Sequence, residues 1–129
     1  MEFMKINIGL AQFNTKLGDI QANLEKHLSL IEEAKAQAAD LLIFPELSLT
    51  GYALQDLAYD SALRPHQEDP VFNELLGASQ KIDLMVSFVH EDRRSRFYIA
   101  AAYLSKGEIC HIHNKVYLPT YGMFDEGRF

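Results

Sequence analysis

The spacing of hydrophobic residues changes twice along the first 44 positions. From Lys5, apolar and polar residues alternate, which predicts a strand over 5–13. The segment "GDIQANLEKHLSLIEEAKAQAA", residues 18–39, spaces its apolar residues three or four apart and predicts an amphipathic helix with Asp19 as its N-cap. "DLLIF", at 40–44, is apolar without alternation, as in a strand covered on both faces. This order predicts a crossover connection between parallel strands.

The rest of the chain continues the alternation of helix and strand. We expect a long loop over 52–70, a helix over 69–82, a strand over 83–91, and two strands within 96–119 joined by a tight turn at 105–108. Pro70 suits the first turn of its helix, and Gly107 supplies the positive φ that the tight turn requires. The order β-α-β-loop-α-β-β-β predicts an α/β layered domain.

Composition and charge exclude several classes of protein. Hydrophobic residues make up 48% and charged residues 23% of the 129 positions, which predicts a packed globular core. The net charge of −6, with no basic run longer than "RR", disfavours nucleic-acid binding. No stretch has the length of a membrane span or the pattern of a secretory signal, so we expect no membrane partner. A single cysteine cannot form an internal disulfide, and we expect a cytoplasmic location.

The stretch "FPELSLTGY", residues 44–52, places a carboxylate directly after a predicted buried strand. Pro45 cannot donate to a sheet ladder, so the strand ends there and Glu46 lies at its rim. Ligands of open α/β sheets bind at the carboxyl ends of strands. Glu46 is therefore a candidate site residue, and a solvated loop glutamate is the alternative.

Lys115 follows the last predicted strand, where it is either a site residue or a surface lysine. Cys110 could be a nucleophile, but side chains five apart in a strand point to opposite faces, so it should not converge with Lys115. His111 and His113 share one face and could ligate zinc, although no third ligand has supporting spacing. We predict no metal. The sequence has neither G-x-G-x-x-G nor a Walker-type loop, and we predict no cofactor.

The C-terminal stretch "NKVYLPTYGMFDEGRF" gathers aromatic residues around an acid pair, Asp125 and Glu126. Such a segment suits either the lining of a small-molecule pocket or a loop held against the core by its aromatic rings.

Together with the opening "INIGLAQFNTKLGDIQANL", the two motifs "FPELSLTGY" and "NKVYLPTYGMFDEGRF" resemble the nitrilase, or carbon–nitrogen hydrolase, superfamily. More narrowly, the chain is similar to the glutamine-hydrolysing domain of glutamine-dependent NAD synthetases. The resemblance implies that Glu46 is a general base and that Lys115 stabilises the tetrahedral intermediate. It also implies that Tyr52 and Tyr121 line the substrate pocket and that Glu126 is a further acidic contact.

The resemblance further implies a fold, namely the N-terminal half of a four-layer αββα sandwich. The family's catalytic cysteine follows the lysine by a few tens of residues, and no such cysteine follows Lys115 here. We interpret residues 4–129 as the N-terminal part of a carbon–nitrogen hydrolase domain, truncated before that cysteine, and residues 1–3 as a cloning remnant. One sheet face should then be apolar and without its partner layer.

The expected function is that of an amidase with a Glu-Lys-Cys triad, acting on a small amide, namely glutamine, and supplying ammonia for NAD synthesis in a longer parent protein. Two alternatives stay open. One is a standalone amidase for another small amide, and the other is a non-catalytic chain that associates through its open sheet face. Family resemblance also implies a homo-oligomer.

Overall fold

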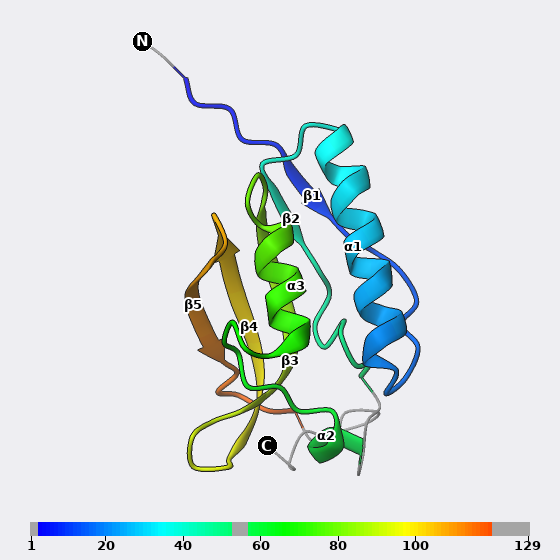
Figure 1. Cartoon of the computed structure of the whole chain (residues 1–129), viewed down its shortest axis with the longest axis vertical. Coiled ribbons are helices and arrows are strands. Elements are labelled where there is room, and N and C mark those ends of the chain that lie inside the picture. The colour runs from blue at the N-terminus through cyan, green and yellow to red at the C-terminus, as the bar shows by residue number, and fades with distance from the viewer. Residues whose placement is uncertain (1–2, 53–56, 120–129) are drawn as a thin grey trace.

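The computed structural model describes residues 3–52 and 57–119 and arranges their strands in one mixed sheet (Figure 1). The strands are β1 (Ile8–Leu10), β2 (Leu41–Ile43), β3 (Asp83–Glu91), β4 (Phe97–Ser105) and β5 (Glu108–Asn114). The helices are α1 (Ile20–Ala36), α2 (Leu57–Asp60) and α3 (Pro70–Ala78). The predicted order of elements is confirmed, with α2 as a short addition within the expected loop.

The order of strands across the sheet follows their order in the chain, β1-β2-β3-β4-β5. β1, β2 and β3 are parallel, as the crossover connection predicted, and β4 and β5 are antiparallel to their neighbours. The predicted strand over 5–13 is longer than the observed β1. The reason is that β1 lies at the edge and pairs only with the three residues of β2.

Side chains fix the helix ends where the sequence predicted them. Asp19 caps α1 by accepting a hydrogen bond from the backbone N–H of Ala22 at 3.0 Å. Pro70 lies in the first turn of α3, after Asp69 as the cap. The helix predicted over 69–82 ends at Ala78, because the Ser79 hydroxyl bonds back to the last turn and also accepts from Gly107 of the β4–β5 turn.

Both long helices, α1 and α3, cover the same face of the sheet (Figure 1). The core between them is formed by alternate residues of the strands and by one side of each helix, among them Leu24, Ile31, Leu42, Phe72, Leu75, Leu84, Val86, Phe88, Ala102 and Leu104. Each of these side chains is almost fully buried. Burial of this apolar area is the main force that holds the two layers together.

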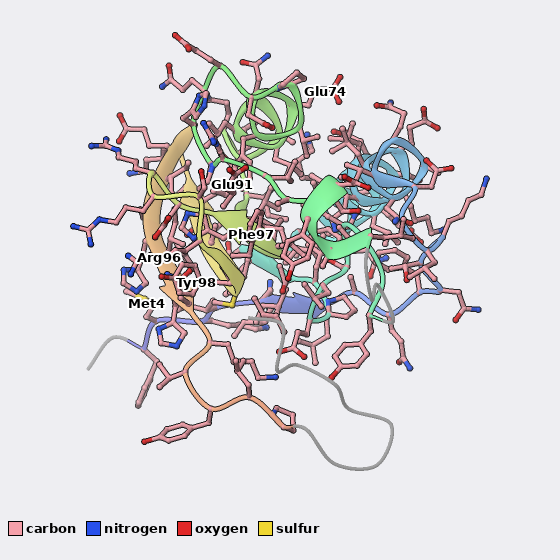
Figure 2. The ribbon with its side chains drawn as sticks, turned by 90° about the horizontal axis from the view of Figure 1, so that it is seen from below. Met4, Glu74, Glu91, Arg96, Phe97 and Tyr98 are labelled. Carbon is pink, nitrogen blue, oxygen red and sulfur yellow. The ribbon has the colours of Figure 1, made fainter. Side chains whose placement is uncertain are left out.

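The opposite face of the sheet has no covering layer within the described residues. It is largely apolar over β1 and β2, whereas β5 contributes His111 and His113 to it. Paired residues share a face, so Leu10, Ile43, Met85 and Tyr103 form one row across four strands. Leu10 is 77% exposed, and Ile8 of the next row is 56% exposed. Figure 2 shows the segment that follows β5 on this side of the sheet, away from α1 and α3. The expectation of an open face is confirmed for the described ranges, and its exposed apolar part lies at β1.

No helix in the described ranges has the length and hydropathy that a bilayer crossing needs.

Candidate active site

Glu46 and Lys115, which are 69 positions apart in the sequence, form an ion pair. Lys115 Nζ lies 2.8 Å from Glu46 Oε1. The topology explains the meeting. β5 is antiparallel to β4, which is antiparallel to β3, so β5 runs in the same direction as β2 and β3. The segments that follow β2 and β5 therefore emerge at one edge of the sheet, which is where α/β sheets bind ligands.

A compact turn after β2 carries Glu46. The N–H of Ser48 donates to Pro45 O at 3.2 Å, and the N–H of Gly51 donates to Leu47 O at 2.7 Å. Leu47 has a φ of 53°, in the left-handed region that non-glycine residues seldom adopt. Such a conformation persists only where the surroundings hold it, and here they do so next to a candidate catalytic residue.

Ser87 of β3 holds this turn against the sheet. Its Oγ accepts a hydrogen bond from the N–H of Leu47 at 2.8 Å and donates one to Ala100 O at 3.0 Å. The N–H of Leu49 also donates to the carbonyl of Ser87, at 3.4 Å. The buried serine thus satisfies the backbone N–H groups of Leu47 and Leu49, in the turn that follows Glu46.

Two contacts fix the backbone around Lys115. Its N–H donates to Ile99 O at 2.7 Å, which extends the pairing of β5 with β4 by one residue. The preceding residue, Asn114, places Oδ1 2.9 Å from Nδ1 of His90 on β3. The backbone of Lys115 is therefore held in place, although its side chain is long.

The ion pair is accessible rather than buried, with the Lys115 side chain 29% exposed and the Glu46 side chain 42% exposed. Pairs of this kind contribute between zero and about 1 kcal/mol to stability. Stability alone does not account for the anchoring of both residues, whereas chemistry on a bound molecule would require it.

A pocket of about 530 Å³ adjoins the pair. Its lining includes Glu46, Met85, Ser87, Ala101, His113, Lys115 and Tyr117. The volume lies in the range of small-molecule sites, and the lining is largely apolar with a few polar groups, as such sites usually are. A carboxylate and an ammonium at the rim of such a pocket could accept a proton and stabilise an oxyanion.

The other predicted site residues have mixed positions. Tyr52 packs against a small cluster of Leu47, Ala58, Val89 and Ile99, next to the turn that carries Glu46. Tyr121 and Glu126 lie outside the described residues, as does Asp125, because the description of this motif ends at residue 119. Their roles in substrate binding stay predictions.

Cys110 lies toward the other end of β5 from Lys115. At about 3.4 Å per residue, five residues of strand separate the two by roughly 17 Å. The thiol is exposed, and it lies 3.9 Å from Glu108 O. The geometry does not bring Cys110 to the Glu46–Lys115 pair.

His111 and His113 both lie on β5, and His113 lines the pocket. Within residues 3–52 and 57–119, no three histidine, cysteine or acidic residues gather where they could hold a metal ion.

Three groups that support Glu46 are not among the residues predicted from the sequence, namely Ser87, Ser48 and His27. His27 is fully buried, with its Nδ1 2.6 Å from Asn23 O and its Nε2 2.8 Å from Ser48 Oγ. Burial lowers the pKa of His27 to about 4, and its hydrogen bond to Asn23 opposes this shift only in part. A signal was present, because His27 falls on the same helical stripe as Leu24 and Ile31 and is a polar residue at a core position.

The two layers of sheet and helices, with an acid–lysine pair at the carboxyl edge, define an α/β domain of the nitrilase type. The carbon–nitrogen hydrolase family model matches residues 7–128, and the chain belongs to this family.

Several relatives are similar over nearly the whole chain. The glutamine-dependent NAD(+) synthetase of Acinetobacter baylyi is 37% identical over 122 residues, which cover 95% of this chain and 22% of that protein. The structure of the glutamine-dependent NAD+ synthetase from Acinetobacter baumannii has a TM-score of 0.80 at 36% identity, over 97% of this chain and 24% of that one. An amidase from Nesterenkonia sp. has a TM-score of 0.75 at 28% identity, over 91% of this chain and 44% of that one. The chain thus spans about a fifth of the length of the synthetases that it matches.

Proposed function

We propose that this chain supplies the general base and the oxyanion-stabilising lysine of an amidase that hydrolyses glutamine. The observation that carries the proposal is the 2.8 Å contact between Glu46 and Lys115 at the carboxyl edge of the sheet, beside a pocket lined by the open sheet face. The family and the names of the similar synthetases support an amide substrate and point to glutamine.

In the proposed mechanism, the Glu46 carboxylate accepts the proton of a cysteine thiol, and the thiolate attacks the amide carbon. The cysteine is supplied by a part of the protein outside this sequence. The Lys115 ammonium stabilises the oxyanion of the tetrahedral intermediate. As the C–N bond breaks, Glu46 returns the proton to the leaving ammonia and a thioester remains. Glu46 then takes a proton from water as the water oxygen attacks the thioester carbon. The C–S bond breaks, Glu46 passes the proton to the departing sulfur, and glutamate and the free thiol are released.

The ammonia is proposed to serve NAD synthesis in the full-length parent protein. The synthetases that support this proposal are several times longer than the present chain. The similarity to each of them extends over 95% or more of this chain. A standalone amidase for another small amide is the alternative, favoured by the likeness to the Nesterenkonia amidase. A panel of amides assayed for released ammonia separates the two, since only the first requires glutamine to be the preferred substrate.

The test of the proposed chemistry uses Glu46→Gln and Lys115→Ala in the full-length protein. Loss of a positioned base or of an oxyanion-stabilising group should lower kcat at least about 100-fold. Glu25→Gln and Lys26→Ala, on the exposed side of α1, are matched controls that should keep normal activity. Near-full activity of either Glu46→Gln or Lys115→Ala would sink the proposal.

The open sheet face favours a second candidate, a non-catalytic chain that forms a homo-oligomer through this face. The exposed Ile8 and Leu10 support it, because a monomer would leave them in water. Analytical ultracentrifugation of the 129-residue chain gives the answer, and a folded monomer would contradict this candidate. We also propose a cytoplasmic location, which the single cysteine supports.

A further inference from the structure

His27 and Ser48 connect helix α1 to the turn that carries Glu46. His27 lies near the middle of α1, and Ser48 lies two residues after Glu46. Both side chains are fully buried, and their Nε2 and Oγ atoms are 2.8 Å apart. A buried side-chain hydrogen bond of this kind holds its partners firmly, because leaving either group unpaired costs about 1–3 kcal/mol.

The chemistry of the partners decides the tautomer of His27. Asn23 O can only accept a hydrogen bond, so the Nδ1 atom at 2.6 Å must carry the proton. In the neutral ring Nε2 is then an acceptor, and the Ser48 hydroxyl must donate to it. The direction of both hydrogen bonds is therefore fixed, and the hydroxyl hydrogen points toward α1.

Aromatic contacts leave the imidazole little freedom to turn. The ring of Phe44 stacks on it at a centroid distance of 4.1 Å and an interplanar angle of 24°. Phe13 meets it edge-on at 5.4 Å. Phe44 is also the residue that leads from β2 into the turn, so the histidine is packed against the chain immediately before Glu46.

Neighbouring bonds hold the turn at three consecutive residues. Ser87 holds the N–H of Leu47, His27 holds the side chain of Ser48, and Nδ2 of Asn23 donates to Leu49 O at 2.9 Å. These contacts come from β3 on one side and from α1 on the other. Leu47, whose backbone has the left-handed conformation, is thus held in the part of the turn that these contacts fix.

We propose that the His27–Ser48 hydrogen bond is a positioning element that aims Glu46 at Lys115 and the adjoining pocket. This inference rests on the proposed role of Glu46 as a base. The proton transfer depends on placement to a fraction of an ångström, and displacement by about 1 Å can cost about 100-fold in rate. Neither His27 nor Ser48 is among the residues that line the pocket, so both act through the turn.

The experiment compares His27→Asn, His27→Gln and Ser48→Ala in the full-length protein, by measuring kcat and KM for glutamine hydrolysis. The asparagine variant keeps a donor near Asn23 O but is too short to reach Ser48. The glutamine variant is long enough to present an acceptor to Ser48. Both lose the ring and its stacking on Phe44, so they form a matched pair for stability.

We expect His27→Asn and Ser48→Ala to lower kcat about tenfold with KM changed less than about twofold, and His27→Gln to retain most of the activity. Thermal unfolding of each variant gives the temperature at which all are folded, and the rates are compared there. Wild-type kcat in His27→Asn and Ser48→Ala would overturn the inference. An equal loss in His27→Asn and His27→Gln would also overturn it, since that result indicates a packing role alone.

Glu46→Gln is measured in parallel and separates the two proposals. If it abolishes turnover while His27→Asn and Ser48→Ala are fully active, the base assignment stands and the positioning inference fails. If Glu46→Gln is itself active, the proposed function fails, and with it the reason for positioning Glu46.

Discussion

Acidification should destabilise this protein through His27 more than through its exposed histidines. The folded structure lowers the pKa of His27 from 6.5 to about 4, because the buried ring would carry its charge without water. The unfolded chain therefore binds a proton between pH 6.5 and about 4 that the folded chain does not bind. The stability that depends on a neutral His27 is complete above pH 6.5, and it is lost as the pH falls toward 4.

The magnitude follows from the size of the shift. Each unit of pKa difference corresponds to about 1.4 kcal/mol, so the shift from 6.5 to about 4 amounts to about 3 kcal/mol. That is a large part of the stability of a small domain, which is usually about 5–15 kcal/mol.

The assay is urea denaturation followed by far-UV circular dichroism at constant ionic strength, in steps from pH 7.5 to pH 4. Wild type is compared with His27→Gln, whose side chain does not titrate, and with His111→Gln as the control at an exposed position. His27→Gln should be less stable at neutral pH but should lose about 3 kcal/mol less than wild type on acidification. If the free energy of unfolding fell equally with pH in wild type and in His27→Gln, the reasoning would be refuted.

Three further changes should affect folding stability. Ser87→Ala leaves the N–H of Leu47 without its partner and should cost about 1–3 kcal/mol in chemical denaturation. Gly51→Ala should cost at least about 1 kcal/mol, because φ is +84° and a Cβ would lie 3.1 Å from Thr15 Oγ1. Asp69→Ala removes the cap of α3, whose side chain accepts from two backbone N–H groups, and should cost about 1 kcal/mol.

Each change has a matched control at an exposed position. Ser29→Ala and Glu68→Ala should alter the free energy of unfolding by less than about 0.5 kcal/mol. Gly77→Ala, in the last turn of α3 with open space where its Cβ would lie, should stabilise by up to about 1 kcal/mol. A stabilising effect of Gly51→Ala, or a neutral effect of Ser87→Ala or Asp69→Ala, would contradict the structural reasoning for that position.

The sequence by itself determined the order of the elements and several of their ends. Period and capping are local properties, so the helix begun by Asp19, the helix begun by Pro70 and the turn at Gly107 were predictable from a few neighbouring residues. Pro45, which stops the predicted apolar strand, likewise identified Glu46 as a candidate before any contact was known. The length of β1 was not predictable, because it depends on how much of β2 is there to pair with.

The tertiary structure decided which side chains meet. Glu46 and Lys115 come together because two antiparallel pairings return β5 to the direction of β2, and their contact is therefore a property of the whole sheet. The helical stripe indicates that His27 is buried, but it does not reveal that His27 bonds to Ser48 or that Ser87 bonds to Leu47. A hydrogen bond between residues on a helix, a turn and a central strand depends on packing in three dimensions, and no periodicity along the chain records it.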